Sequence, residues 1–99
     1  MIRGTTPTHS FTVNIDTAMI EKLLISYAQD DAEIITKDKD DCVLQDNTIA
    51  CTLSQEDTLK FNCKKAVMIQ LKVKTVDGAV AMTDIITTTV GKCLNDEVI

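Results

Sequence analysis

Cysteine and histidine are the residue types in this chain of 99 residues that could mark a metal site or a nucleophile. The four cysteines, Cys42, Cys51, Cys63 and Cys93, form none of the closely spaced pairs that structural zinc sites use. We therefore expect no metal and no cofactor, with the cysteines acting as small hydrophobic residues. The only histidine, His9, lies at the start of the first expected strand, where we expect it to be solvated rather than paired with a thiol.

A second group of residues with chemical potential is acidic. Asp38, Asp40, Asp41 and Asp46 could offer oxygen ligands to calcium, but they lack the order of an EF-hand loop and its final glutamate. We interpret the run as a solvated strand edge, where charge discourages aggregation between sheets. The three glycines are scattered and build no phosphate-binding loop. No residue is therefore predicted to be catalytic, cofactor-binding or metal-binding, and we do not expect an enzyme.

Composition narrows the classes of partner. A net charge of −5 repels nucleic-acid phosphates and anionic membranes, and an aromatic content of 3% leaves few stacking surfaces for bases or sugars. No apolar run approaches membrane-spanning length, and the first residues do not resemble a signal peptide. We expect synthesis in a reducing cytoplasm with free thiols, although Cys42 and Cys51 could be bridged geometrically.

The elements that position these residues are predicted from an apolar–polar period of two. Strands are expected over residues 9–15, 23–28, 33–37, 42–45, 48–53, 67–74 and 79–90. Asp16 should cap a single helical turn between the first two strands. Ser54 and Asp57 form a capping box for a one-turn helix over residues 55–59, which should carry the chain from one sheet to the other. The segment 37–41 is expected to be an exposed loop or edge.

Three short polar pairs predict hairpin tips, and each tip fixes a register. The tip at residues 30–31 would place Tyr27 opposite Ile34 and Ile25 opposite Thr36. The tip at residues 46–47 would place Cys42 opposite Cys51 and Leu44 opposite Ile49. A two-residue turn at Asp77-Gly78 would place Asp84 opposite Leu71 on the buried face, where a carboxylate is costly. We therefore expect a bulge near Ala81 or Met82.

These expectations describe one domain over residues 1–99, an all-β immunoglobulin-like antiparallel sandwich of about seven strands with one or two single-turn helices. The antibody Cys–Trp–Cys core signature is absent, since the chain has no tryptophan. Ten residues are expected to be buried: Phe11, Val13, Ile25, Tyr27, Leu44, Ile49, Leu53, Ile69, Leu71 and Val73.

Four segments carry a resemblance to a known group of proteins: residues 1–8, 53–59, 69–75 and 90–92. Over nearly its whole length the chain resembles small uncharacterised proteins encoded beside tail genes in prophages of Gram-positive bacteria. More distantly, its strand pattern is similar to the N-terminal immunoglobulin-like domain of phage baseplate upper proteins. That group has no catalytic motif to transfer to residues of this chain.

The resemblance implies a non-enzymatic structural or protein-interaction module of a phage tail or baseplate, made in the cytoplasm and incorporated into the virion. Its expected partners are other phage structural proteins, or further copies joined through a sheet edge or through residues 1–8 and 92–99. Apolar residues in those two segments, Ile2, Leu94, Val98 and Ile99, would gain from burial. The alternative is a small binding domain, either a carbohydrate-recognising accessory, against which the few aromatics count, or an assembly chaperone.

Overall fold

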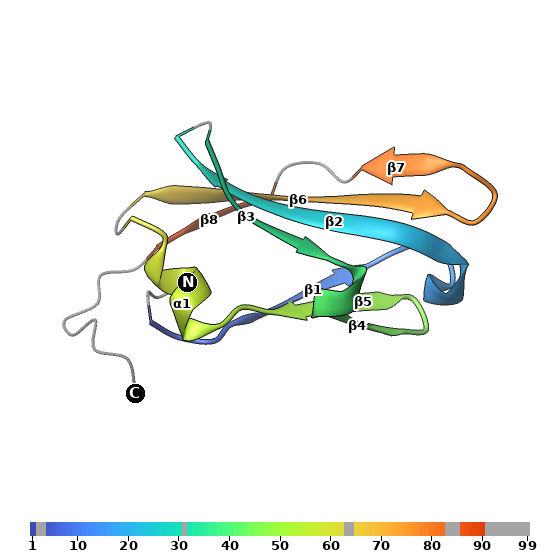
Figure 1. Cartoon of the computed structure of the whole chain (residues 1–99), viewed down its shortest axis with the longest axis horizontal. Helices are drawn as coiled ribbons and strands as arrows, with labels where there is room; N and C mark the ends of the chain where they lie inside the picture. The colour runs from blue at the N-terminus through green and yellow to red at the C-terminus, as the bar shows by residue number, and fades with distance from the viewer. Residues whose placement is uncertain (2–3, 31, 63–64, 83–85, 91–99) are drawn as a thin grey trace.

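The computed structural model describes residues 1, 4–30, 32–62, 65–82 and 86–90, which form two antiparallel sheets packed face to face (Figure 1). The smaller sheet has the order β1-β5-β4, with β1 at Thr8–Thr12, β5 at Thr48–Thr52 and β4 at Cys42–Gln45. The larger sheet has the order β3-β2-β6-β7, with β3 at Ala32–Asp38, β2 at Ile20–Gln29, β6 at Ala66–Thr75 and β7 at Val80–Met82. A further strand, β8 at Ile86–Thr89, also pairs with β6. The expected all-β sandwich is confirmed.

A single helical turn carries the chain across each change of sheet. These turns are η1 (Thr17–Met19) between β1 and β2, η2 (Lys39–Asp41) between β3 and β4, and α1 (Gln55–Leu59) between β5 and β6. Asp16 accepts a hydrogen bond from the Ala18 amide at 2.9 Å, and Ser54 with Asp57 forms the capping box of α1. Both predicted caps are therefore confirmed, and a polar side chain begins each crossing because the first amides of a helical turn need an acceptor.

The segment 37–41, expected to be an exposed loop or edge, lies at the end of the edge strand β3 and in η2, and residues 38–41 are exposed. Asp38 and Asp41 form a capping box that folds the end of this segment into a helical turn. Lys37 belongs to β3 and is half-buried, because its ammonium group reaches inward to Asp57 of α1 at 2.8 Å.

The hairpin of β4 and β5 follows the predicted register. Cys42 pairs with Cys51 and Leu44 pairs with Ile49. Asp46 at the tip has a φ of 53°, the positive value that such turns need and that Asp tolerates. A two-residue turn thus sets both pairings from the sequence alone.

The predicted register of β2 against β3 differs by one residue from the observed register over most of the pair. The pairing begins as expected, with Ala28 opposite Glu33, but Tyr27 then pairs with Ile35 rather than with Ile34. Ile25 accordingly lies opposite Lys37, not opposite Thr36. One extra residue on β3 makes a bulge, which places Ile35 in the core and directs Lys37 toward the inner face.

The hairpin of β6 and β7 also differs from the two-residue turn that we predicted. Lys74 pairs with Val80, and the Thr75 amide donates to the Ala79 carbonyl at 2.9 Å, so the loop has three residues, ending at Gly78. Gly78 has a φ of 91°, which a glycine adopts without strain. This loop shifts the register of β7 by one residue relative to the prediction.

The pairing of β6 changes register between β7 and β8. Lys72 pairs with Met82 and Ile69 pairs with Ile86. Going from the first pair to the second, the chain advances three positions on β6 but four positions from β7 to β8. The connection from β7 to β8 is therefore one residue longer than the stretch of β6 that it faces. The sequence predicts a bulge near Ala81 or Met82, but these two residues pair regularly with β6, and the register changes only between Met82 and Ile86. Asp84, where the predicted conflict falls, lies outside the described residues.

The core lies between the sheets and is mostly aliphatic, with three aromatic residues, Phe11, Tyr27 and Phe61, and the thiol of Cys51. Eight of the ten residues expected in the core are buried. The other two, Val13 and Leu44, are half-buried, because β1 ends at Thr12 and β4 is an edge strand. The core also holds seven residues outside that list of ten: Ile20, Leu23, Ile35, Cys51, Phe61, Val67 and Val90.

Candidate functional site

A polar cluster between the sheets is the first candidate. His9, Cys51 and Cys42 form a row across the smaller sheet, since His9 pairs with Cys51 and Cys51 pairs with Cys42. Tyr27 faces this row from the larger sheet, and its hydroxyl lies 2.9 Å from His9 Nδ1. The two rings pack at a centroid distance of 5.5 Å. The expectation that His9 is solvated is therefore wrong: it is half-buried, because Tyr27 reaches it from the opposite sheet.

The electrostatics of this cluster favour neutral groups. Burial lowers the pKa of His9 below its usual 6.5, and burial raises the pKa of Tyr27 well above its usual 10. Burial likewise raises the pKa of Cys51, and it raises that of Cys42 to about 12, with the neighbouring Cys51 thiol adding to the shift. A nucleophilic cysteine needs a lowered thiol pKa, so this arrangement suits packing rather than covalent catalysis.

Both cysteines in the described residues are free thiols. Cys51 is buried, whereas Cys42, on the edge strand, is half-buried and directs its Sγ to the Asp38 carbonyl at 3.3 Å. Cys63 and Cys93 lie outside the described residues. The thiols of Cys42 and Cys51 are within hydrogen-bonding reach of each other, as the predicted register requires.

A half-buried ion pair closes one end of the sandwich. Lys37 of β3 contacts Asp57 of α1 at 2.8 Å, with 19% and 11% of the two side chains exposed. Burial alone would raise the pKa of Asp57, but the Lys37 ammonium group and the capping hydrogen bonds of Ser54 lower it below its usual 3.8. The carboxylate thus holds both the start of α1 and the larger sheet, which is a structural role.

The acidic run does not converge on one point. Asp38 accepts from the Asp40 amide at 3.0 Å, and Asp41 accepts from the Asp38 amide at 3.1 Å, so two carboxylates cap η2. Asp46 lies at the tip of the β4–β5 hairpin. Within the part of the chain that the structure describes, no three His, Cys, Asp or Glu side chains are grouped so that they could hold a metal ion.

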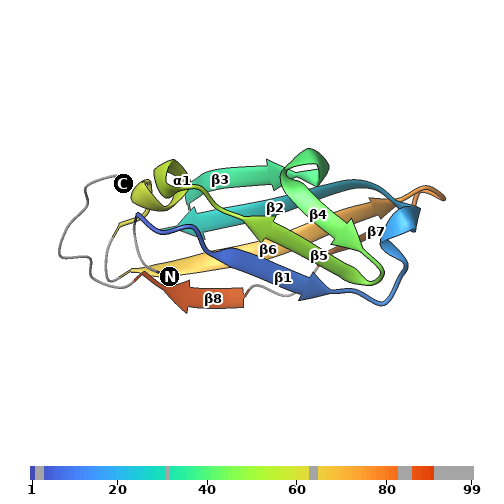
Figure 2. The same cartoon turned by 90° about the horizontal axis from the view of Figure 1, so that it is seen from below.

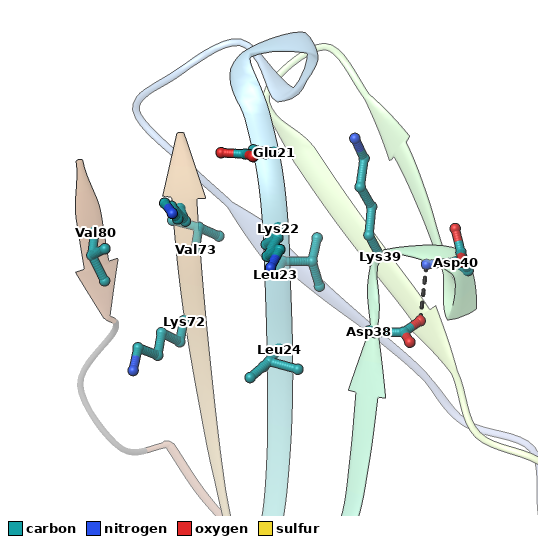
Figure 3. A pocket seen from close by; sticks show the side chains of 11 residues that line it. Glu21, Lys22, Leu23, Leu24, Asp38, Lys39, Asp40, Lys72, Val73 and Val80 are labelled. Atoms are coloured by element: carbon teal, nitrogen blue, oxygen red, sulfur yellow. Dashed lines mark hydrogen bonds between the residues drawn. The ribbon is translucent and has the colours of Figure 1, made fainter. Parts of the chain in front are cut away.

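A hollow lies on the outer face of the larger sheet, not between the sheets (Figure 3). It measures about 670 Å³ and is lined by residues of β2, β3, η2, β6 and β7. Lys22 pairs with Lys74, and Leu24 pairs with Lys72, so three lysines and an exposed leucine share its floor. The Lys72 ammonium group in Figure 3 is directed toward β7, on which Val80 lies. Asp38 and Asp40 line the opposite flank.

A second, smaller hollow of about 250 Å³ opens at the side of the sandwich, between the end of β1 and the strands β6 and β7. Its lining includes the core residues Leu71 and Val73 together with the half-buried Val13 and Ile15. The short strand β7 therefore has a lysine-lined hollow on its outer face and an apolar hollow on its inner face. This surface was not predicted from the sequence, because the alternation over residues 79–90 suggested one continuous strand.

The described part of the N-terminal arm packs on its own chain. The Gly4 amide donates to Thr58 Oγ1 at 3.0 Å, and Thr58 Oγ1 donates to the Thr5 carbonyl at 2.8 Å. The Leu53 amide donates to the Pro7 carbonyl at 2.9 Å. The arm thus seals the α1 end, whereas Lys92 to Ile99 lie outside the described residues.

No protein-family model, no curated protein and no solved structure matches this chain. None of the helices in the described ranges is long and apolar enough to cross a membrane.

Proposed function

We propose that this protein is a non-enzymatic structural or protein-interaction module of a phage or prophage tail or baseplate, built on an immunoglobulin-like sandwich. The observation that carries the interaction part is the position of the exposed apolar surface. It gathers at a sheet edge, beside β7, rather than in a closed cleft. Sheet edges are sites where proteins add strands from a partner, whereas small-molecule sites are concave and enclosed.

The strand order supports the immunoglobulin-like part of the proposal. If β1 is taken as strand B, the two sheets become B-E-D and C′-C-F-G, with β7 and β8 together as strand G. This is the immunoglobulin order without strand A. Tyr27 then lies on strand C, the strand on which antibody domains carry their buried tryptophan.

The tail or baseplate part rests on the resemblance of residues 1–8, 53–59, 69–75 and 90–92 to prophage tail-region proteins. The cluster of His9, Tyr27, Cys42 and Cys51 favours this reading over catalysis, because burial keeps each of these groups neutral. A neutral, hydrogen-bonded cluster between two sheets orders a core.

The test is the composition of virions. Particles induced from a lysogen that encodes this chain would be purified on a density gradient and probed with an antibody against the chain. We expect a constant number of copies per particle, and tails that are malformed or absent when the gene is deleted. Detection in the lysate but not in particles, with defective assembly after deletion, would favour an assembly chaperone. Normal particles after deletion would contradict the proposal.

A further inference from the structure

Three exposed large apolar residues, Val76, Val80 and Met82, lie on the hairpin of β6 and β7, and others lie on neighbouring elements. Six of the seven in the described ranges lie on or beside β6, β7 and β8, and they are Met19, Leu24, Val76, Val80, Met82 and Ile86. Met19 belongs to this group because its carbonyl accepts from the Val76 amide at 2.9 Å. The seventh, Val43, lies on β4 and is 69% exposed. Isolated exposed apolar residues are normal on a protein surface, but a gathering of this kind marks a contact surface.

The edge at β7 is open; two lysines lie one strand away from it, and Asp77 lies in the loop at one end. Among the described strands β7 pairs only with β6, and all three of its residues are exposed. Lys72 and Lys74 pair with Met82 and Val80, so their long side chains flank the edge from one strand away. A strand added beside β7 would direct alternate side chains toward the lysines on the outer face and toward the apolar hollow on the inner face.

The edge at β4 is flanked by aspartates. Among the described strands β4 pairs only with β5, and it exposes Val43 at its middle. Asp40 and Asp41 precede the strand and Asp46 follows it. Figure 2 shows β4 and β1 at the two sides of the smaller sheet, with β3 on the side of β4 and β8 on the side of β1. Since β7 and β8 flank the same side of β6, the β4 and β7 edges lie on opposite sides of the sandwich.

We propose that the β7 edge of one copy binds the β4 edge of a second copy by strand pairing. The inference deepens the proposed function and rests on it for its biological setting, but the contact itself needs only this chain. Charge favours this pairing over pairing of like edges, because two β7 edges would place two lysine-bearing surfaces beside each other, and two β4 edges would place two aspartate-bearing ends beside each other. A contact between different edges leaves one free edge of each kind at the ends, so the assembly grows as an open row instead of closing as a dimer.

The first test is sedimentation velocity of the whole chain over a range of concentrations up to several hundred micromolar. We expect species larger than dimers to grow with concentration at low salt, and to dissociate as sodium chloride screens the charges. Lys72→Glu/Lys74→Glu and, separately, Asp40→Lys/Gln45→Lys/Asp46→Asn should each weaken association roughly ten-fold or more. A control matched to the lysine variant, Lys60→Glu/Lys65→Glu, makes the same change of net charge at the α1 end and should leave association within about two-fold of the unaltered chain.

The second test mixes the two edge variants. Each alone carries edges of one sign, but in a mixture every reversed edge meets an edge of opposite charge, so association should return to that of the unaltered chain. Circular dichroism of each variant checks that it is folded. A chain that stays monomeric throughout, a dimer that does not grow, or a mixture that remains dissociated would overturn the inference. Virion incorporation of a chain that is monomeric in solution would overturn it while leaving the proposed function intact.

Discussion

The α1 end and the β6–β7 hairpin end of the sandwich differ in which side chains they bury and which they expose. At the α1 end, polar side chains are buried and paired: Gln29, 2% exposed, donates to the Asn62 carbonyl at 3.1 Å and accepts from the Asn62 amide at 2.8 Å. At the hairpin end, apolar side chains are exposed, with Met82 at 62% and Val80 at 58%. At the α1 end, buried polar groups form hydrogen bonds within the chain. At the hairpin end, exposed apolar side chains are available for contact with another molecule.

The difference implies that the α1 end contributes mainly to stability and the hairpin end mainly to recognition, in a molecule 47 Å long. Substitutions at the α1 end should change the free energy of unfolding, whereas substitutions at the hairpin should change association and leave unfolding nearly unaltered. The following experiments would break or sharpen that division.

The largest effect is expected from Tyr27→Ala. Tyr27 is fully buried, lies 6.1 Å from Phe61 by ring centroids, and is hydrogen-bonded to His9. Its removal leaves a cavity between the sheets and an unpaired imidazole, so the free energy of unfolding should fall by about 3–5 kcal/mol in urea titrations. The matched change at the other end, Met82→Ala, should cost less than about 0.5 kcal/mol. Equal losses at the two ends would refute the division.

Alkaline pH should produce the next effect, which begins in the buried cluster. Folding raises the pKa values of Tyr27, Cys42 and Cys51, so the folded state keeps protons that the unfolded state releases. The resulting stability is complete below about pH 8.5 and declines as the pH rises above it. Urea midpoints measured between pH 7 and 11 should fall above pH 9, and Cys42→Ala should lessen the fall. A flat profile would show that these groups are open to solvent.

Asp57→Asn should cost about 1–2 kcal/mol in the free energy of unfolding. The amide is nearly the same size but loses the charge that Lys37 and the Ser54 amide share, at 2.8 Å and 3.0 Å. Glu56→Gln, which removes a charge from an exposed neighbour on the same helix, is the control and should change little. An equal loss in both variants would assign the effect to net charge instead.

His9→Gln should give the smallest change, visible only as a difference in pH dependence. Burial lowers the pKa of His9, so its contribution to stability is present above about pH 6.5 and is lost as the pH falls and the unfolded state takes up a proton. Between pH 7 and 5 the unaltered chain should therefore lose more stability than the variant. Parallel profiles of thermal midpoints against pH would contradict this.

The features that could be predicted from the sequence are those determined by neighbouring residues: a hairpin register, a capped helix and the buried face of a strand. The register of Cys42 against Cys51 follows from a two-residue turn, and the helix over residues 55–59 follows from its capping box. The alternation of Val67, Ile69, Leu71 and Val73 correctly predicted the buried face of β6. Each of these signals lies within a few residues of the feature that it specifies.

The features that could not be predicted depend on contacts between residues that are far apart in the sequence. The bulge in β3 leaves no local signal, because its result, the contact of Lys37 with Asp57, joins two elements that the chain meets far apart. His9 looked solvated because Tyr27, its partner, lies in the other sheet. The exposed surface at the β6–β7 hairpin was not predicted for the same reason. The alternation of apolar and polar residues shows which face of the sheet a residue occupies, but not whether another element covers that face.

The pairing of β1 with β5 has a consequence for synthesis on the ribosome. Thr8 and Thr52, whose hydroxyl groups are 2.7 Å apart across these strands, are separated by 44 positions. At about 5–20 residues per second, β1 therefore waits roughly 2–9 s before its only described partner strand has been made. The hairpin of β2 and β3 emerges during that interval, so the larger sheet begins to form first. The earliest strand of the chain is thus among the last to be enclosed, and a nascent-chain stall in this window would leave it open to chaperones.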